Sequence, residues 1–573
     1  MLTTANDKLN TGDPAKDKDN TIVNVARYLK RMARVQPYSR AVVCPRGRTA
    51  SGRATYSHLT FLQLERASDI LAHGLEASGI RRQTRTIVMV RPGLEFFVLI
   101  FAMFKVGAVP VMVDPGMGVG RMVDCLKQSR AQAMIGIPQA HVLRVLYRRH
   151  FRTVKHWITV GRRWFWPGPT LQGLLDQPYR PFTMARTTAS EVAAILFTTG
   201  STGPAKGVIY THGVFDAQIR IIKSQYEIVP GETDLPTFPL FSLFDPALGM
   251  TAVIPDMDPT RPAKADPVKI IRAIEDHGVT NMFASPALLD RLGRYGQKHE
   301  VKLPSLKRVI TAGAPAAPVV MERFVKMLQD EALVHTGYGA TEAMPVSSFS
   351  SREILEETRR LSEKGFGICV GRPNSEMEVR IIRITDDPIV HWSDELVLPP
   401  NEIGEIAVRG PVVTGGYFER PRQDALSKIR QGASIWHRMG DLGWMDKKGR
   451  IWFCGRKSHR VITPEKTLYT IPCEAIFNNH PMVYRSALVG PGTPPRQKAL
   501  ICIEVEKQHA RADRRQLADE LFRLAGANEL TAGIRLLMFH PSFPVDIRHN
   551  AKIFREKLKV WAEKNIERAY RAE

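Results

Sequence analysis

The segment richest in groups that could do chemistry runs from residue 193 to 212 and reads AAILFTTGSTGPAKGVIYTH. An apolar stretch leads into a run of hydroxyl residues and glycines, and Lys206 and a second apolar stretch follow. Glycines let backbone N–H groups approach an anion closely, hydroxyls add donors, and a lysine supplies compensating charge. The segment therefore predicts a phosphate-binding loop. Its residues are Thr198, Thr199, Gly200, Ser201, Thr202 and Gly203.

Two other interpretations of this loop are weaker. A Walker A loop needs the pattern G-x-x-x-x-G-K-[S/T] at the start of a helix. Here Ala205 replaces the second glycine, Gly207 replaces the Ser/Thr, and a strand is expected to follow. A P-loop ATPase or kinase is therefore disfavoured. A flexible Ser/Thr/Gly turn is the structural alternative, and the density of phosphate-compatible groups argues against it.

Four further motifs follow in chain order: AGAP at 312–315, YGATE at 338–342, RMGD at 438–441 and GR at 455–456, with Lys552 near the end. Each has a simple structural explanation if taken alone. Tyr338 could be a packed aromatic, Asp441 a turn residue between glycines, and Lys552 a surface charge in a basic tail. Together and in this order, from about residue 25 to 560, they resemble the adenylate-forming superfamily, which includes acyl-CoA synthetases, adenylation domains and luciferases.

The resemblance implies an ATP site. It assigns Tyr338 to stacking on adenine, Asp441 to the ribose hydroxyls, and Gly455-Arg456 to the start of the hinge. The guanidinium fork of Arg456 could anchor the ribose or phosphate side. It also implies that Glu342, with Thr202, holds Mg²⁺. The remaining residues that the resemblance assigns to the nucleotide are Gly313, Ala314 and Pro315, as the wall of the adenine pocket, and Gly339 and Thr341.

The chemistry that these groups permit is carboxylate activation. A substrate carboxylate attacks the α-phosphate of ATP, which gives an acyl-adenylate and pyrophosphate. Because two anions must meet, positioning and charge neutralisation dominate the barrier. The resemblance implies that Lys206 follows the β- and γ-phosphates and that Lys552 neutralises charge at the reacting centre, so Lys552, Glu342 and Lys206 are the expected catalytic residues.

The sequence departs from the superfamily pattern in three segments. Ser242 stands where the family often has a histidine, Lys466 and Thr467 replace a glycine pair after the hinge, and Ala551 replaces the glycine before Lys552. A loop without those glycines is poorly suited to lie against a pantetheine thiol, because close backbone approach needs missing side chains. These departures put transfer to coenzyme A in doubt.

The segments FPLFSLFDPALGMTAVIPDMDPTRPAKADP and DIRHNAKIF resemble one branch, the olefin β-lactone synthetases of bacterial hydrocarbon biosynthesis. That resemblance implies a long-chain 2-alkyl-3-hydroxy acid as substrate, whose β-hydroxyl attacks the acyl carbonyl, expels AMP and closes a β-lactone. It also implies a complex with other olefin-pathway enzymes, including a β-lactone decarboxylase. Asp245 and His212 are candidate proton acceptors, against the alternatives of a capping aspartate and a loop histidine. A long-chain acyl-CoA or acyl-AMP ligase remains the alternative.

The elements expected around these motifs alternate between helix and strand. Hydrophobic periodicity predicts helices at Thr60–Ser78 and Phe96–Val106 and a strand at Val109–Val113. Such alternation favours parallel sheets covered by helices. The other strands expected in this body are Thr86–Val90, Val192–Phe197, Val279–Ala284 and Arg308–Thr311.

After Gly371 the pattern changes to short strands separated by Gly, Pro and Asp turns, which predicts an antiparallel or barrel-like subdomain. The strands expected there are Glu378–Ile384, Gly404–Arg409 and Ile451–Cys454. The fold class is therefore α/β: a large N-terminal domain with parallel sheets and a β-rich subdomain, then a small mobile α+β domain. The expected boundaries are 1–20 for a disordered lead-in, 21–455 for the ATP/acyl-binding domain and 456–573 for the mobile domain.

Composition restricts the function less than the motifs do. The 573 residues contain 81 Lys+Arg and 57 Asp+Glu, a net charge of +24. This charge suits nucleic acid, an anionic membrane or a phosphorylated substrate, but no groove-reading or RNA-stacking motif accompanies it, so a nucleic-acid-binding protein is the weaker alternative. Six scattered cysteines indicate free thiols in a reducing compartment. The longest apolar run, Phe96–Phe104, is too short to span a bilayer, and a cytoplasmic enzyme without a transmembrane segment is expected.

Overall fold

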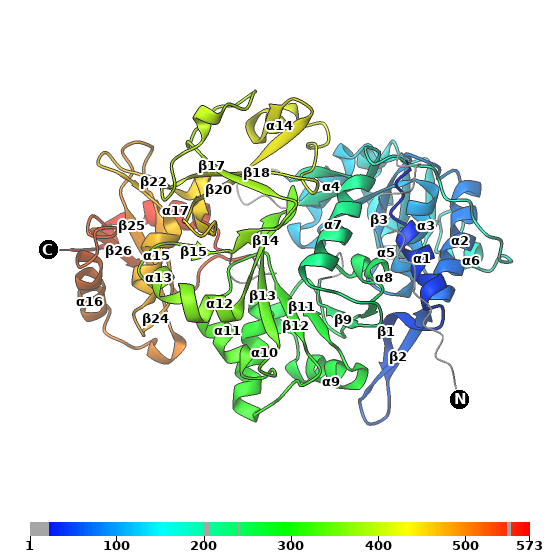
Figure 1. Cartoon of the computed structure of the whole chain (residues 1–573), viewed down its shortest axis with the longest axis horizontal. Coiled ribbons are helices and arrows are strands. Elements are labelled where there is room, and N and C mark those ends of the chain that lie inside the picture. The colour runs from blue at the N-terminus through cyan, green and yellow to red at the C-terminus, as the bar shows by residue number, and fades with distance from the viewer. Residues whose placement is uncertain (1–21, 199–204, 239–240, 547–551, 573) are drawn as a thin grey trace, which may run out of the picture.

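The structure is a computed structural model that describes residues 22–198, 205–238, 241–546 and 552–572. Figure 1 shows the N-terminal body (blue to green) at the right and centre and the C-terminal part (orange to red) at the left. Two helix-covered sheets form the body, and a third, antiparallel sheet lies between the body and the C-terminal part. This arrangement is the predicted α/β class with a β-rich subdomain.

The first sheet has six strands in the order β6-β5-β3-β4-β7-β8. All neighbours pair in parallel except β7 and β8, which form an antiparallel hairpin. The bounds are β3 (Arg85–Met89), β4 (Val109–Val113), β5 (Ala133–Gly136), β6 (His156–Thr159), β7 (Val192–Thr198) and β8 (Lys206–Thr211). The β7–β8 hairpin thus encloses the predicted phosphate loop.

Helices cover this sheet. Helix α2 (Phe61–Ala77) lies within one residue of its predicted bounds at each end. The side chains of Thr60 and Gln63 each accept the other residue's backbone N–H and so cap the start of this helix. Helix α3 (Leu94–Val106) begins two residues before the predicted start and is buried on all sides. The other helices of this region are α1 (Arg27–Val35), α4 (Val119–Gln128), α5 (Pro138–Leu146), α6 (Leu171–Leu175) and α7 (His212–Gln225).

The second sheet has nine strands in the order β16-β14-β13-β12-β11-β9-β10-β1-β2. Its hairpin β1 (Arg40–Arg48)/β2 (Ala54–Thr60) has no counterpart among the predicted strands, and β1 pairs in parallel with β10, more than 200 residues later. The other strands are β9 (Thr233–Pro236), β10 (Thr251–Val253), β11 (Asn281–Phe283), β12 (Arg308–Thr311), β13 (Leu333–Ala340), β14 (Ala343–Ser350) and β16 (Arg372–Pro373). The helices between them are α8 (Asp245–Leu248), α9 (Pro267–His277), α10 (Pro286–His299), α11 (Pro318–Val325), α12 (Ser351–Glu353) and α13 (Arg359–Glu363).

The antiparallel subdomain has the strand order β15-β21-β20-β18-β17, with β19 paired to β20. Its bounds are β15 (Ile368–Cys369), β17 (Glu378–Ile382), β18 (Gly404–Arg409), β19 (Lys428–Gln431), β20 (Ser434–Met445) and β21 (Ile451–Arg456), with helix α14 (Pro421–Ser427) before β19. Strand β18 has its predicted bounds, β17 ends two residues earlier and β21 continues two residues further. An ion pair between Arg438 and Glu405, both 1% exposed, joins β20 to β18 at 2.6 Å.

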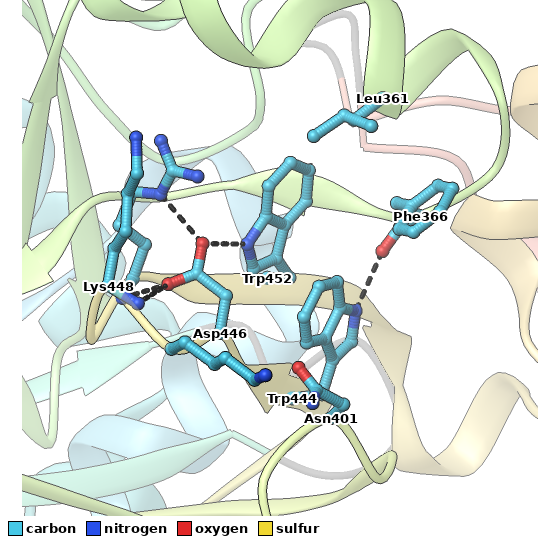
Figure 2. Close-up of a pocket in the computed structure, with 9 residues that line it drawn as sticks. Leu361, Phe366, Asn401, Trp444, Asp446, Lys448 and Trp452 are labelled. Atoms are coloured by element: carbon cyan, nitrogen blue, oxygen red, sulfur yellow. Dashed lines mark hydrogen bonds and ion pairs between the residues drawn. The ribbon is translucent and has the colours of Figure 1, made fainter.

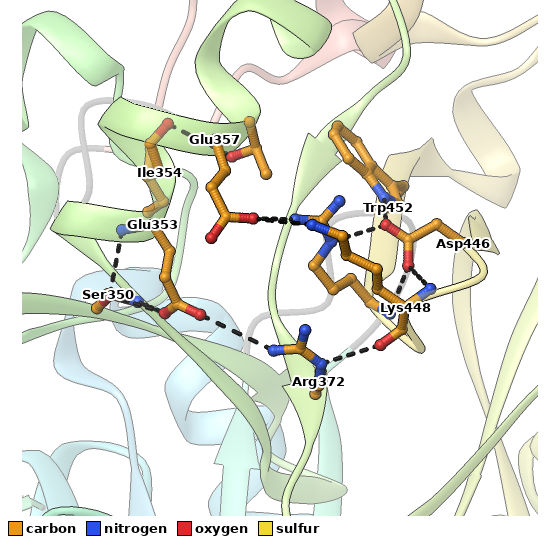
Figure 3. Close-up of polar contacts among 10 residues, drawn as sticks. Ser350, Glu353, Ile354, Glu357, Arg372, Asp446, Lys448 and Trp452 are labelled. Atoms are coloured by element: carbon orange, nitrogen blue, oxygen red, sulfur yellow. Dashed lines mark hydrogen bonds and ion pairs between the residues drawn. The ribbon is translucent and has the colours of Figure 1, made fainter.

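The outer end of the β20–β21 hairpin carries a small pocket of about 270 Å³ (Figure 2). The Trp444 and Trp452 indoles stack there, with centroids 5.2 Å apart and an interplanar angle of 8°. Asp446 accepts hydrogen bonds from the Trp452 indole and from Arg450, and Glu357 pairs with Arg450 (Figure 3). This network fixes the hairpin against the helical segment 351–363.

The C-terminal part has a four-stranded sheet of β24 (Val483–Val489), β25 (Leu500–Val505), β26 (Leu536–Phe539) and β27 (Tyr570–Arg571). Helices α15 (Thr470–Asn478), α16 (Arg514–Gly526) and α17 (Arg555–Lys564) and a hairpin of β22 (Val461–Ile462) and β23 (Thr467–Leu468) complete this α+β unit. Strand β21 ends at Arg456, the first residue of the domain predicted to be mobile; the boundary and the mobility remain predictions. No helix in the described ranges is long and apolar enough to cross a membrane.

Candidate active site

The predicted phosphate loop lies between the paired ends of β7 and β8. Thr198 is the last residue of β7 and pairs with Lys206, the first residue of β8. Thr199, Gly200, Ser201, Thr202 and Gly203 lie outside the described residues.

Glu342 is placed by a tight turn. Ala340 and Ala343 pair across β13 and β14, so Thr341 and Glu342 are the two residues of that hairpin turn. The Glu342 carbonyl accepts hydrogen bonds from the Thr414 N–H at 2.9 Å and the Thr414 hydroxyl at 3.1 Å. The Thr341 carbonyl accepts one from the Tyr210 hydroxyl at 2.6 Å. Both turn residues are therefore held by their backbone.

Tyr417 connects the predicted carboxylate to the predicted lysine. Its hydroxyl donates to Glu342 Oε1 at 2.7 Å, and the Lys206 ammonium lies 4.8 Å from the centroid of its ring. Such a cation–π contact keeps an ammonium in place without neutralising it. Burial lowers the pKa of Lys206, and the Glu342 carboxylate acts in the opposite direction. The structure thus places Lys206 beside Glu342.

Three further residues support this pair, and the sequence analysis missed them along with Tyr417. The Asp424 carboxylate accepts the Tyr417 N–H at 2.8 Å, and Lys428 Nζ donates to the Thr414 carbonyl at 2.5 Å. Lys428 is buried, and its desolvation lowers its pKa to about 8. The one signal in the sequence was the dipeptide Gly415-Gly416 before Tyr417, which indicates a turn but not its partner.

The predicted ribose-side residues form a second cluster. Asp441 and Arg456 face each other across β20 and β21. Asp441 Oδ1 accepts from Arg456 Nη1 at 2.6 Å, and Asp441 Oδ2 accepts from the Tyr338 hydroxyl at 2.8 Å. The Asp441 carboxylate raises the pKa of Arg456, and burial raises that of Tyr338. These contacts fix the plane of the Tyr338 ring and leave each carboxylate oxygen capacity to accept further bonds.

The AGAP turn lies beside this cluster. Gly313, Ala314 and Pro315 follow β12, whose last residue pairs with Thr336 two positions before Tyr338. Gly313 has a φ of +90°, a conformation that residues with side chains rarely adopt. A Cβ on Gly339 would lie 2.7 Å from the Ala343 carbonyl oxygen, so only glycine fits there.

Lys552 lies in the C-terminal part of the chain. Its carbonyl accepts from the Asp546 N–H at 2.9 Å, and its neighbour Ile553 bridges to Val545, so a short hairpin presents it. Burial is the main cause of its lowered pKa, followed by the positive charge of Arg456. Asp441 and Glu342 act in the opposite direction. These charges act on the Lys552 ammonium, and its catalytic role stays a prediction.

A buried ion pair anchors the chain just after Lys552. Arg555 donates to both oxygens of Glu474 at 3.0 and 2.6 Å, and Glu474, 4% exposed, also accepts the Leu488 N–H. A bidentate pair of this kind fixes direction as well as distance. It ties the start of α17 to α15 and so restricts where Lys552 can point.

The two candidate proton acceptors lie in the interior. His212 is fully buried, its Nδ1 accepts the Val25 N–H at 3.4 Å, and burial lowers its pKa to about 4. Asp245 begins α8 beside Asp234, and burial with that neighbouring carboxylate raises the pKa of Asp245 well above its usual range. Ser242 is buried in the preceding turn. Within the described residues no hydrogen bond or ion pair joins His212 or Asp245 directly to Glu342, so their role stays a prediction.

The Glu342 carboxylate with Lys206 beside it, and the Tyr338–Asp441–Arg456 cluster, are groups that suit the transfer of a nucleotidyl group to a carboxylate. The model of the AMP-binding enzyme family matches residues 29–418, and the chain belongs to that family of adenylate-forming enzymes.

Similarity to individual proteins indicates which branch of this enzyme family the chain resembles. The chain is 47% identical over 549 residues to the olefin beta-lactone synthetase of Xanthomonas campestris pv. campestris, covering 95% of this chain and 98% of the relative. It is 46% identical over 557 residues to the protein of the same name from Stenotrophomonas maltophilia, covering 96% and 100%. The solved structure of ATP-bound MatB from Rhodopseudomonas palustris superposes with a TM-score of 0.75 at 18% identity, covering 94% of this chain and 99% of that one. The resemblance to the adenylate-forming superfamily, and to its olefin β-lactone synthetase branch, is therefore confirmed.

Proposed function

We propose that this enzyme activates a long-chain 2-alkyl-3-hydroxy acid with ATP and closes it to a β-lactone. The observation that carries the proposal is the connection of Lys206 to Glu342 through Tyr417, although Lys206 comes from a sheet edge and Glu342 from a two-residue turn. The full-length similarity to two olefin beta-lactone synthetases supports the choice of substrate.

The first step, formation of the acyl-adenylate, depends on neutralising negative charge more than on covalent catalysis by the protein. The substrate carboxylate forms a bond to the α-phosphorus of ATP as pyrophosphate leaves. Lys206 and the predicted loop at 198–203 would hold the phosphates that depart. Lys552 would offset the negative charge that develops where carboxylate and α-phosphate meet, an effect that is large where water is excluded. Tyr338 and Asp441 would orient the adenosine.

Glu342 fits a magnesium ligand. Within the described part of the chain, only the Tyr417 hydroxyl donates to its carboxylate, so the second oxygen has no protein donor. A hard carboxylate oxygen beside phosphate oxygens is the donor set that Mg²⁺ prefers. When bound, the ion would neutralise phosphate charge, and Tyr417 and Thr414 would keep Glu342 in place for it. Thr202 is proposed as a second ligand.

The second step is intramolecular. The β-hydroxyl oxygen bonds to the acyl carbon, the acyl–phosphate bond breaks, and AMP leaves while the hydroxyl proton is lost. Because both reacting groups belong to one molecule, the effective molarity is high, although ring strain offsets part of this gain.

The loop at 463–468 favours the lactone over a coenzyme A thioester. Thr463 closes the turn by donating to the Lys466 carbonyl through both its N–H and its hydroxyl. The Lys466 ammonium donates to the Glu529 carbonyl at 2.9 Å. The loop is thus bound to its own domain where a thiol-binding loop needs an open glycine backbone.

The test uses the purified chain with ATP, Mg²⁺ and a 2-alkyl-3-hydroxy acid, without coenzyme A. We expect AMP, pyrophosphate and a β-lactone in equal amounts. With the matched 2-alkyl acid that lacks the hydroxyl, the reaction should stop at the acyl-adenylate. A product that forms only with coenzyme A would establish the acyl-CoA ligase instead, and ADP would exclude adenylation. A β-lactone would next be consumed by a decarboxylating enzyme, which we propose as a pathway partner.

A further inference from the structure

One stretch of the chain concentrates much of the excess positive charge. Residues 125–175 contain nine Lys and Arg and no Asp or Glu, so this stretch supplies nine of the net 24 positive charges. The basic residues are Lys127, Arg130, Arg144, Arg148, Arg149, Arg152, Lys155, Arg162 and Arg163. No acidic side chain within the stretch offsets them, and of the nine only Arg130 forms an ion pair within the described residues, with Glu419 at 3.0 Å, so the surface that the others share is positive.

The fold gathers the second half of this stretch into one surface. The His141 ring on α5 stacks on Trp166 with centroids 5.2 Å apart. The Arg144 guanidinium, one turn further along α5, lies 4.4 Å from the centroid of the Trp157 ring. The Trp157 indole donates to the Pro167 carbonyl at 2.6 Å. Helix α5, strand β6 and the loop at 160–169 are therefore one packed unit.

Large apolar side chains project from this unit into solvent. Phe165 is 74% exposed, Leu146 is 72% exposed and Trp164 is 51% exposed. Phe165 and Trp164 rest on the buried Trp166, with ring centroids 5.0 and 5.7 Å away. Soluble surfaces rarely group exposed aromatic and aliphatic side chains, so a cluster of this kind marks an interaction site.

Five cations of this unit have no side-chain partner in the described part of the chain, whereas Arg163 donates to the Gly168 carbonyl and Arg144 lies over Trp157. All five are exposed. They are Arg148, Arg149, Arg152, Lys155 and Arg162. Guanidinium and ammonium groups without protein partners remain available for external anions.

We propose that this basic aromatic surface, residues 145–149, 152, 155 and 162–165, binds an anionic lipid bilayer. Aromatic and leucine side chains that protrude among cations match the apolar boundary and the charged headgroups of such a bilayer. A nucleic acid would find cations here too, but Leu146 offers no face on which a base can stack. The combination of the two chemistries therefore favours lipid.

The position of the surface suits an enzyme that stays active on a membrane. β6 is one edge of the six-stranded sheet, and β8, which begins with Lys206, is the other edge. Five strand spacings separate them, roughly 24 Å. Helix α5 lies in the half of the molecule away from the C-terminal part (Figure 1). A bilayer at α5 would leave the Lys206 side of the sheet and the C-terminal part in water. The inference stands on this surface and does not depend on the proposed reaction.

The test is flotation of the full-length protein with two kinds of vesicle, phosphatidylcholine alone and phosphatidylcholine with roughly one third phosphatidylglycerol. We expect binding to the anionic vesicles and little to the neutral ones. Replacing three surface cations should weaken binding about fivefold for each charge lost, or roughly a hundredfold together. The variant is Arg148→Gln/Arg149→Gln/Arg162→Gln. Its control removes three exposed cations elsewhere: Lys264→Gln/Lys298→Gln/Lys507→Gln.

A second pair of variants tests the apolar contribution. Trp164→Ser/Phe165→Ser should weaken vesicle binding even at full charge, whereas Val390→Ser, at another exposed apolar position, should not. Pyrophosphate exchange at the wild-type rate shows that each variant is folded. Equal binding to both vesicle types, or equal losses in the control variants, would overturn the proposal. So would binding of duplex DNA but not vesicles through the same three arginines.

Discussion

Removing one oxygen atom from Tyr417 tests how Glu342 is held. Tyr417→Phe deletes the hydroxyl that donates to Glu342 Oε1 at 2.7 Å and keeps the ring under the Lys206 ammonium. A hydrogen bond to a charged group contributes about 1.5–3 kcal/mol net. If this contact is fully felt in the transition state, kcat/KM for adenylation should fall roughly 10- to 100-fold, because about 1.4 kcal/mol corresponds to a factor of ten.

The assay is ATP–pyrophosphate exchange measured over a range of Mg²⁺ concentrations. Tyr417→Phe should need more Mg²⁺ for half-maximal exchange, since the carboxylate is no longer held by Tyr417. Tyr210→Phe is the matched control: its hydroxyl donates at 2.6 Å to the neutral Thr341 carbonyl, where a loss of about 0.5–1.5 kcal/mol is expected. Exchange by Tyr417→Phe close to wild type at every Mg²⁺ concentration, or an equal loss in the control, would refute the reasoning.

Three other changes have defined outcomes. Lys552→Ala should lower pyrophosphate exchange roughly a hundredfold or more while calorimetry still detects ATP binding; near wild-type exchange would remove Lys552 from the mechanism. Arg555→Met leaves the Glu474 carboxylate buried without its partner and should cost about 3–5 kcal/mol in denaturant unfolding; a change within experimental error would show that the pair is dispensable. Burial lowers the pKa of Lys428 to about 8 from an ordinary 10.5, so between these pH values the unfolded chain binds the proton that the folded chain has lost. Folding stability relative to Lys428→Met should therefore rise as pH increases through this window, and a constant difference in chemical denaturation would contradict the shift.

Local patterns in the sequence were enough to predict the bounds of several strands and to identify the candidate site residues that lie in motifs. Strands β4, β12 and β18 have their predicted bounds because each is a short apolar run closed by turn residues. Glu342, Asp441 and Lys206 were found because each stands in a motif whose residues are adjacent in the chain. The structure places Lys206 beside Glu342, and Asp441 between Tyr338 and Arg456; their roles in binding ATP stay predictions.

Contacts between distant segments could not be predicted in this way. Tyr417 lies 75 residues from Glu342, and a tyrosine after two glycines carries no mark of its partner. Strand β1 belongs to the second sheet because it pairs with β10, and periodicity reports a strand but not its neighbour. The grouping of cations on α5, β6 and the adjacent loop was likewise not predicted, because the net charge of the whole chain does not show where the charged residues lie.

The β20–β21 hairpin gives this enzyme an optical reporter of its proposed nucleotide site. Trp444 and Trp452 pair across the same two strands that pair Asp441 with Arg456, three to four residues away. Two indoles stacked 5.2 Å apart at 8° couple their electronic transitions, and the near-ultraviolet circular dichroism of such a pair depends on their mutual angle. If a nucleotide changes the fit of Asp441 against Arg456, we expect the twist between the two strands to change as well. Occupancy of the site can then be followed as a spectral change, with no label attached.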